Sequence, residues 1–325
     1  MLKLEYLFEN FDLARYALED YPHDASRLEE SLNWFRISSN AVYPFFDDNG
    51  LNFLRLCPAQ EKSLEMVAGE IEFIEYLIDC GFAAMKPIAG FSQKKCRQID
   101  TPWGEYCVSA FRRVCGTSIE DTELTESVLY AYGRALGELH RLSMDFVPRH
   151  KRTTYEEVAI EMKLYLPEEL CSVLDCVMEN LAQIPRNREN FGLVHYDFEP
   201  DNVFYDVNTG KIHVIDFDDC LYHYYALDVE QSLDSLAELI PENEWQTAKE
   251  IFLNGYRSEH SLPAEMEEKL PLMRQFVNLR AYARLSGCLD SKPLFHPPWL
   301  DELIGRLEEK RAALKQSLLK WQMKV

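Results

Sequence analysis

The chain has 325 residues, of which 47% are hydrophobic and 12% aromatic, enough for one large or two ordinary globular domains. This composition excludes a disordered protein. Its 55 acidic and 34 basic residues give a formal net charge of −21. Binding to a nucleic-acid backbone is therefore not expected, because such binding needs Lys and Arg to neutralise phosphates. The acidic surplus fits a cationic partner better than an anionic one, although it can also serve only solubility.

Cysteine usage and hydropathy restrict the protein further. Nine cysteines are scattered from Cys57 to Cys288 without a CxxC pair, so neither a disulfide framework nor a zinc site is indicated. The first ten residues are amphipathic and acidic, and no apolar run is long enough to cross a bilayer. We therefore expect a cytoplasmic protein that does not contact a membrane.

The first part of the chain is expected to combine helices with a sheet. Residues 1–33 have apolar side chains at helical spacing, and residues 61–80 repeat them every three or four positions until Gly81. Between these helices, the polar turn of Ser38, Ser39 and Asn40 and the hairpin turn at 47–50 separate short apolar runs. The expected strands are residues 34–37, 41–46, 51–57, 96–99 and 105–111.

The second part is expected to be mainly helical. The predicted helices are residues 123–143, 155–184 with an interruption at Pro167, 229–239, 242–256, 264–289 and 300–325. A proline-rich aromatic loop at 293–299 separates the last two. In the first of these helices His140 is expected to be a packing residue rather than a catalyst.

A hairpin is predicted between the helices of this second part. Residues 203–205 and 212–215 have the composition of strands, and the segment 206–210 between them contains the turn formers Asn, Thr and Gly. Such a hairpin would bring Asp216, at the end of the second strand, beside Asn202, just before the first.

Three oxygen-bearing side chains around this hairpin have the spacing that phosphoryl transfer uses. Asp197 lies five residues before Asn202, so one loop can orient a substrate hydroxyl with the carboxylate and hold Mg²⁺ with the amide. Asp216 would add a second metal ligand. An Asp near an Asn is common in surface loops, but the combination with His195 and the hairpin indicates a phosphotransferase.

The pattern His195-x-Asp197-x-x-x-x-Asn202, followed by Ile215-Asp216-Phe217-Asp218, resembles the catalytic loop and metal strand of the aminoglycoside phosphotransferase and choline kinase superfamily. Within it the sequence is most similar to the bacterial subgroup that holds type II homoserine kinase-like proteins and a stress-response protein kinase. Tyr196 departs from the family, in which many members have Gly.

The resemblance implies an α/β (α+β) fold with two lobes, as in protein kinases. A small antiparallel-sheet lobe with one key helix, residues 1–112, would bind the nucleotide. A larger helical lobe, residues 113–325, would carry the catalytic loop and the acceptor site.

The resemblance also implies a nucleotide site in the small lobe. The turn of Ser38, Ser39 and Asn40 would take the place of the phosphate-covering loop. Arg55 would steady the ATP phosphates where the family often has Lys, since its planar fork suits phosphate oxygens. Glu70 would pair with Arg55, with Glu65, Glu72 and Glu75 as competitors. The main chain of Ala110, Phe111 and Arg112 would read adenine.

In the catalytic lobe the resemblance implies that Asp197 accepts or orients the hydroxyl proton and that Asn202 and Asp216 hold Mg²⁺. His195 would orient the loop through hydrogen bonds, and an Asp at the place of Asp228 braces it. The role of Asp218 stays open between metal or substrate binding and tuning of the local charge.

These observations favour an ATP- and Mg²⁺-dependent kinase that acts on a hydroxyl of a small, positively charged molecule, such as an amino alcohol, amino sugar or amino acid. The alternatives are a Ser/Thr protein kinase of the stress-response type and a non-catalytic nucleotide-binding module. The intact set of Asp197, Asn202 and Asp216 argues against the last. The sequence does not indicate an oligomeric state.

Overall fold

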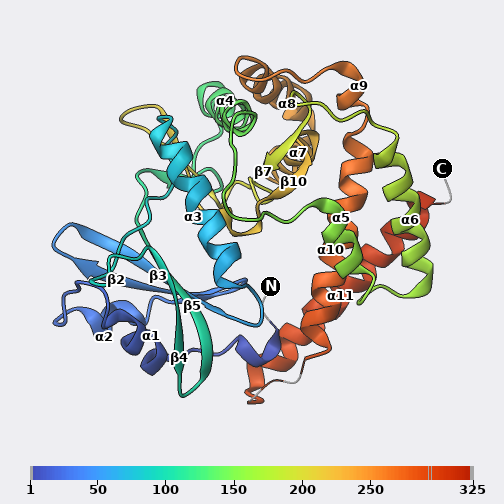
Figure 1. Ribbon diagram of the computed structural model, residues 1–325. Coiled ribbons are helices and arrows are strands. Elements are labelled where there is room, and N and C mark those ends of the chain that lie inside the picture. The colour runs from blue at the N-terminus through green and yellow to red at the C-terminus, as the bar shows by residue number, and fades with distance from the viewer. Residues whose placement is uncertain (1–2, 292, 294, 323–325) are drawn as a thin grey trace.

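The computed structural model describes residues 3–291, 293 and 295–322. Leu294 of the predicted aromatic loop, and both ends of the chain in the predicted terminal helices, lie outside the described residues. The chain folds into a part built on a sheet and a part built on helices (Figure 1), which we call the sheet lobe and the helical lobe. The predicted α/β (α+β) fold is confirmed.

The sheet lobe contains a five-stranded antiparallel sheet in the order β1-β2-β3-β5-β4. Its strands are β1 (Arg36–Ile37), β2 (Ala41–Asp47), β3 (Gly50–Pro58), β4 (Cys96–Thr101) and β5 (Gly104–Arg112). The predicted strands are present, but the first is only two residues long. The predicted turn joins β2 to β3, where Gly50 has a φ of +115°, a conformation that side chains disfavour.

Helices cover both faces of this sheet (Figure 1). The short elements η1 (Leu4–Tyr6), α1 (Phe11–Leu18) and α2 (Leu28–Leu32) precede the sheet, and Leu13 and Leu18 of α1 pack with Tyr43 and Leu54 on one face. Helix α3 (Leu64–Asp79) lies on the other face, towards the helical lobe. It ends before Gly81, whose φ is +93°, as the sequence predicted.

The helical lobe contains eight named helices among the described residues. They are α4 (Glu126–Ser143), α5 (Tyr155–Met162), α6 (Glu168–Ala182), α7 (Ala226–Leu239), α8 (Glu242–Arg257), α9 (Ala264–Glu267), α10 (Leu270–Leu289) and α11 (Pro298–Gln322). The interruption at Pro167 is confirmed, because Pro167 precedes α6. The single helix predicted at 264–289 is wrong. It is split before Leu270, where Pro271 lacks the N–H group that a continuing helix needs.

Three short strand pairs frame the loops between these helices. Strand β7 (Phe191–Val194) pairs with β10 (Leu221–Tyr224), and β8 (Val203–Asp206) pairs with β9 (Lys211–Val214) and with β6 (Thr117–Ser118). The β8–β9 hairpin is the predicted one. Strands β6, β7 and β10 were not predicted.

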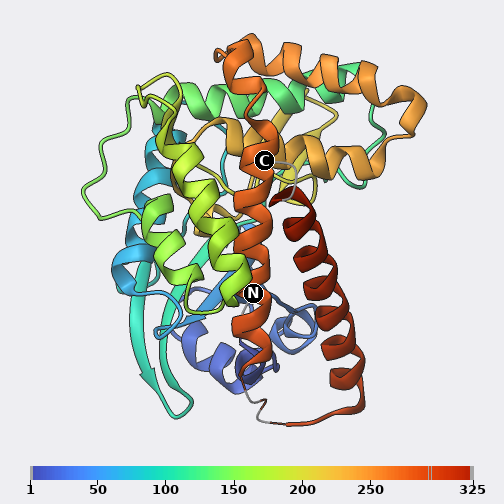
Figure 2. The same cartoon turned by 90° about the vertical axis from the view of Figure 1, so that its right-hand side faces the viewer.

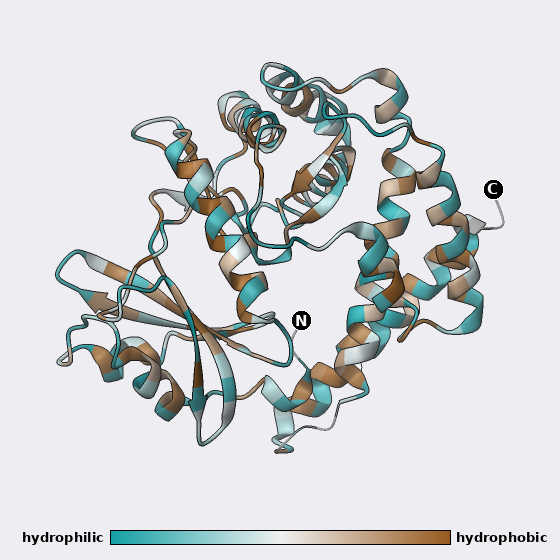
Figure 3. Ribbon diagram, in the orientation of Figure 1, coloured by the Kyte–Doolittle hydropathy of each residue, from teal (hydrophilic) through white to brown (hydrophobic). Residues whose placement is uncertain are grey.

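Helices α10 and α11 run side by side and reach down to the sheet lobe (Figure 2). A small apolar cluster of Leu4, Leu285, Cys288, Leu300 and Leu307 joins them to the start of the chain. The helices carry bands of hydrophobic and hydrophilic residues (Figure 3), and none in the described ranges is long and apolar enough to cross a membrane.

Candidate active site

The buried Asp228 of α7 holds the loop between β7 and β8, residues 195–202, through hydrogen bonds to its main chain. The carboxylate of Asp228 accepts hydrogen bonds from the N–H groups of His195 (2.7 Å) and Tyr196 (2.8 Å). A third contact comes from the buried His140, whose Nε2 lies 3.1 Å from the same carboxylate. His140 is therefore a packing residue under this loop, and the expected bracing by Asp228 is present.

The buried His195 ties the loop to the strand that precedes Asp216. Its Nε2 lies 3.0 Å from the carbonyl oxygen of Ile215, which can only accept, so Nε2 carries the proton. Its Nδ1 then accepts from the N–H group of Asp197 at 3.2 Å. Burial lowers the pKa of His195, which favours this neutral form. His195 thus fixes the position of Asp197 relative to Ile215, the residue before Asp216.

Tyr196 stands where many members of the resembled family have Gly, and its surroundings show how a large side chain is accommodated there. Its φ is +69°, in the left-handed region where glycine is favoured and a side chain costs roughly 1–2 kcal/mol. The buried ring offsets this cost, because the guanidinium of Arg280 lies 3.8 Å from its centroid.

Asp197, Asn202 and Asp216 come together as the hairpin predicted. Asn202 Nδ2 donates to the carbonyl oxygen (3.1 Å) and to Oδ2 (2.9 Å) of Asp197, which turns its Oδ1 away from that carboxylate. The N–H group of Ile215 donates to the carbonyl oxygen of Asn202 at 3.0 Å, which places Asp216 next to it. Asp216 has a φ of +64°, and its carboxylate is not hydrogen-bonded to any described residue.

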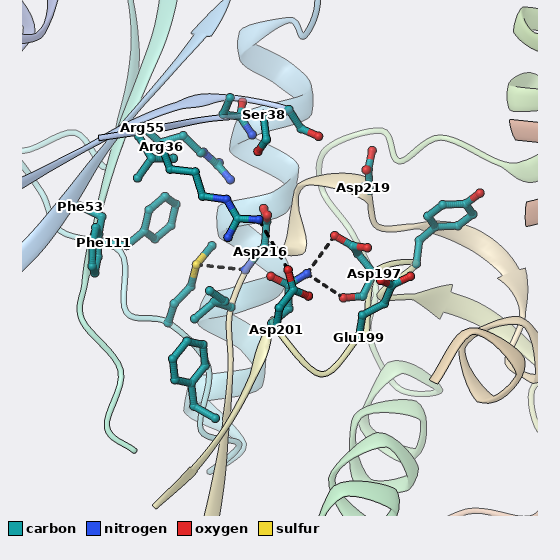
Figure 4. Close-up of a pocket in the computed structure, with 18 of the residues that line it drawn as sticks. Arg36, Ser38, Phe53, Arg55, Phe111, Asp197, Glu199, Asp201, Asp216 and Asp219 are labelled. Atoms are coloured by element: carbon teal, nitrogen blue, oxygen red, sulfur yellow. Dashed lines mark hydrogen bonds and ion pairs between the residues drawn. The ribbon is translucent and has the colours of Figure 1, made fainter. Parts of the chain in front are cut away.

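The pKa values of Asp197 and Asp216 are raised in this surrounding. Burial, then the charges of Glu199, Asp219 and Asp218, raise the pKa of Asp197 to about 8. Burial and the charge of Asp218 raise the pKa of Asp216 well above its ordinary value. Figure 4 shows Asp197 and Asp216 facing the same cavity. Carboxylate and amide oxygens are the ligands that a hard divalent cation takes, and a bound cation would favour the charged form of both carboxylates.

Arg55 and Glu70 form a buried ion pair with two contacts. Arg55 Nη1 and Nη2 lie 2.8 and 2.5 Å from the two carboxylate oxygens of Glu70, and the two residues are 5% and 2% exposed. Of the three competing acids, Glu72 binds Arg149, Glu75 binds Lys95, and Glu65 is exposed.

The turn of Ser38, Ser39 and Asn40 is attached to the helical lobe. The buried Asn40 donates from Nδ2 to Oδ2 of Asp218 at 2.6 Å, and Ser39 Oγ accepts from Arg284 Nη2 of α10 at 3.0 Å. Ser38 donates its N–H to the carbonyl oxygen of Asn40 at 3.0 Å, which closes the turn.

Three basic side chains around Asp218 and Asp219 were missed by sequence reasoning. Lys62 Nζ lies 2.5 Å from Oδ2 of Asp218, and the two arginines of α10, Arg280 and Arg284, lie 3.1 and 2.6 Å from Asp219. Burial alone would raise the pKa of Asp219, but these cations hold that pKa well below its ordinary value. The only available signal was that Arg280 and Arg284 are one helical turn apart. We call Lys62, Asp218, Asp219, Arg280 and Arg284 the ionic cluster.

The main chain at the end of β5 was expected to read adenine, but part of it is already hydrogen-bonded within the fold. Ala110 is buried and its carbonyl oxygen accepts from the N–H of Ile88 (2.8 Å), while the N–H of Arg112 donates to Lys86 (2.9 Å). Ala110 is therefore not available to a ligand, because its carbonyl is used within the fold. The N–H of Val114, just after the strand, is not hydrogen-bonded to any described residue.

A cavity of about 690 Å³ joins these groups, with walls from both lobes. Its apolar lining includes Val42, Phe53, Phe111, Val114 and Ile215. Figure 4 shows Phe53 and Phe111 at one end of the cavity, which we call the apolar end, and Asp197 and Glu199 at the other. Its charged lining comprises seven basic side chains, Arg36, Arg55, Arg112, Arg113, Arg280, Arg284 and Lys310, and five acidic ones, Asp197, Glu199, Asp201, Asp216 and Asp219. The overall acidic surplus therefore does not extend to this cavity.

Comparison with known proteins identifies the family. The sequence profile of the phosphotransferase enzyme family (APH) matches residues 30–269, most of the chain. The chain belongs to the phosphotransferase enzyme family. Its resemblance to the aminoglycoside phosphotransferase and choline kinase superfamily is thereby confirmed, and it is a kinase or phosphotransferase enzyme.

Similar proteins act on small molecules. The amicoumacin kinase of Bacillus subtilis (strain 168) is 25% identical over 266 residues, which is 78% of each chain. The homoserine kinase of Caulobacter vibrioides is 32% identical over 120 residues, 35% of this chain and 38% of its own.

Two solved structures extend the likeness to nearly the whole fold. The amicoumacin kinase hAmiN, in complex with AMP-PNP, Ca²⁺ and Ami, superimposes with a TM-score of 0.78 at 22% identity, covering 95% of this chain and 94% of its own. A microcompartment-associated aminopropanol kinase gives a TM-score of 0.70 at 20% identity, covering 95% and 98%. At these identities the two structures establish only the fold of this phosphotransferase, not its substrate.

Proposed function

We propose that this phosphotransferase moves the γ-phosphoryl group of ATP, with Mg²⁺, to a hydroxyl of a small molecule. The observation that carries the proposal is the convergence of Asp197, Asn202 and Asp216 on one cavity that is also lined by Arg55, the partner of Glu70. Phosphoryl transfer depends mainly on positioning and charge stabilisation, which such a set can supply.

For the nucleotide, the apolar end of the cavity would hold adenine, and the main chain of Phe111, Arg112 and Val114 would read its edge, without the Ala110 carbonyl. Arg55, held rigidly by Glu70, would present its guanidinium to the phosphates. The Ser38–Ser39–Asn40 turn would cover them. The division into a nucleotide-binding lobe, 1–112, and a catalytic lobe, 113–325, is part of this proposal.

For the metal, Oδ1 of Asn202 and the carboxylate of Asp216 would hold Mg²⁺, which when bound neutralises phosphate charge. Asp197 would orient the acceptor hydroxyl and take up its proton. Asn202 holds the side chain of Asp197 through a hydrogen bond to its carboxylate. His195 holds the main chain of Asp197 by accepting a hydrogen bond from its N–H group. His195 is a positioning residue in this scheme, because its Nε2–H is directed to Ile215 and not to the cavity.

For the acceptor, we retain a small hydroxylated molecule that carries at least one positive charge. The support from total charge is weaker than the sequence indicated, because basic side chains outnumber acidic ones in the cavity wall. Five of these basic residues are however already paired within the protein, Arg36 with Asp201, Arg55 with Glu70, Arg112 with Asp47, and Arg280 and Arg284 with Asp219. The names of the related amicoumacin and aminopropanol kinases agree with a small-molecule acceptor.

The experiment that tests this function is transfer from γ-labelled ATP, with and without Mg²⁺, to a panel of amino alcohols, amino acids, aminoglycosides and matched neutral and anionic alcohols. Self-labelling and a protein acceptor are followed in parallel. We expect Mg²⁺-dependent labelling of a small cationic alcohol. Labelling confined to proteins would favour the Ser/Thr kinase alternative, and nucleotide binding without any transfer would favour a non-catalytic module.

A further inference from the structure

Gln231 of α7 is a buried polar side chain without a partner in the wall of the active-site cavity. It is 3% exposed, and its carboxamide oxygen has no hydrogen-bond partner. No side-chain hydrogen bond joins either end of this carboxamide to another described residue. Leaving a buried amide unpaired costs about 1–3 kcal/mol, so such a group facing a cavity is suited to a ligand.

Glu199 is the second unpartnered polar group in the same wall. Its carboxylate forms no ion pair or side-chain hydrogen bond with the described part of the chain, whereas Asp219 contacts two arginines and Asp201 lies 3.6 Å from Arg36. Burial and the charge of Asp201 raise the pKa of Glu199, as expected for a carboxylate that lacks a cation.

The main chain fixes these two residues relative to each other. The hydroxyl of Ser232, which follows Gln231, donates to the carbonyl oxygen of Phe198, which precedes Glu199, at 2.8 Å. Tyr132 donates to the same oxygen at 2.7 Å. Both donors and Phe198 are buried, so the two backbone positions are held rigidly side by side.

The nearby basic residues leave the carboxylate of Glu199 available. Arg274 is paired with Glu230 at 2.6 Å and with Asp234 at 2.9 Å. Lys310 of α11 lines the cavity but is exposed, and it forms no ion pair with the described residues.

Resting on the proposed phosphotransferase function, we propose that Glu199 and Gln231 form the subsite that selects the acceptor, binding an ammonium group next to the hydroxyl that receives the phosphoryl group. An ammonium has three donors and no acceptor, so a carboxylate and a carboxamide oxygen match it. The carboxamide can turn its oxygen to the cavity, because its two ends are nearly equal in shape.

The position of the subsite also limits the acceptor. Glu199 follows Asp197 by two residues, and two residues of extended chain span at most about 7 Å. Figure 4 shows the side chains of Asp197 and Glu199 near each other on the catalytic loop. The acceptor class is therefore an amino alcohol whose ammonium and hydroxyl are separated by only a few bonds.

The test compares two acceptors that differ at one group, 1-amino-2-propanol and 1,2-propanediol, at saturating ATP and Mg²⁺. We expect the wild-type enzyme to prefer the amine. Glu199→Gln should reduce the ratio of the two kcat/KM values by roughly tenfold or more, because a hydrogen bond to a charged group is lost, with the KM for ATP unchanged. Gln231→Leu should reduce the ratio several-fold, and Gln231→Glu should increase it.

Two matched controls separate this effect from changes in total charge or in core packing. Asp234→Asn removes a charge near Glu199 outside the cavity wall, and Gln275→Leu removes a buried amide of α10 that does not line it; both should leave the ratio unchanged.

A wild-type preference for the diol, or an unchanged ratio in Glu199→Gln and Gln231→Glu, would overturn the inference while leaving the phosphotransferase function intact. Transfer to no acceptor in the wider panel, with nucleotide still bound, would instead contradict the proposed function and the inference with it.

Discussion

Two charge networks each place at least one residue in the wall of the same cavity but differ in how the chain builds them. The Arg55–Glu70 pair joins residues 15 positions apart, on β3 and on the helix that packs over its sheet. The ionic cluster instead joins Lys62 to Asp218 and Asp219 and these to Arg280 and Arg284, across both lobes. The first network belongs to one local unit, and the second exists only once the lobes are assembled.

The difference teaches that total charge is a poor guide to a site. The chain has a net charge of −21, yet the cavity at its candidate active site is lined by more basic than acidic side chains. Most of these bases are already paired with carboxylates, so the groups left for a ligand are fewer than the lining suggests. Substrate charge must therefore be argued from unpaired groups.

The largest expected effect comes from breaking the local pair. Glu70→Ala leaves the buried guanidinium of Arg55 without its partner, which should lower the free energy of unfolding by about 3–5 kcal/mol. Glu75→Ala on the same helix is the control, because Glu75 and its partner Lys95 are 38% and 41% exposed and the loss should be under about 1 kcal/mol. Urea unfolding measures both, and equal losses would show that the burial of the Arg55–Glu70 pair has no energetic consequence.

Breaking the long-range cluster should have a smaller effect on stability. Lys62→Met removes one cation from Asp218, which keeps its hydrogen bond from Asn40, so we expect a loss of roughly 2 kcal/mol in the free energy of unfolding. A double-mutant cycle with Asp218→Asn should give a coupling energy of about 1–3 kcal/mol. Strict additivity of the two changes would mean that the contact contributes nothing to holding the lobes together.

Arg55 can be tested without removing its charge. Arg55→Lys should keep measurable activity with a higher KM for ATP, because an ammonium lacks the planar fork, whereas Arg55→Ala should lose most activity. Steady-state kinetics with varied ATP decide this. Wild-type kinetics in both variants would leave Arg55 with a purely structural role.

The smallest expected effect concerns the stacking of Arg280 on Tyr196. Arg280→Lys keeps the positive charge near Asp219 but loses the flat contact with the ring, which should lower the free energy of unfolding by about 0.5–1 kcal/mol. Thermal unfolding beside the exposed control Arg188→Lys measures the difference. A loss above about 2 kcal/mol would mean that the Asp219 contact, and not the stacking, depends on the guanidinium.

The parts that sequence could predict are those that local pattern determines. Alternating apolar residues and a turn at Gly50 located β2 and β3, and helical spacing located α3 with Glu70 on its buried face. The short β8–β9 hairpin, which places Asp216 beside Asn202, could also be predicted from local pattern, namely two strand-like runs and the turn formers between them.

The parts that sequence could not predict depend on contacts between distant segments. Strands β7 and β10 pair across the hairpin, and Arg284 reaches Ser39 over 245 positions. Neither contact leaves a periodic signal in the chain. The carbonyl of Ala110 is likewise used by Ile88, from a segment without regular secondary structure, so the pattern of β5 alone could not show it.

The central claim, that Asp197 handles the acceptor proton in a site assembled with Asn202 and Asp216, is tested most directly by Asp197→Ala. Turnover from labelled ATP to the acceptor and binding of ATP with Mg²⁺ should be measured on the same purified variant. We expect turnover to fall by roughly two or more orders of magnitude, the usual effect of losing a proton-handling group, with ATP and Mg²⁺ binding nearly intact. Turnover close to wild type would contradict the claim.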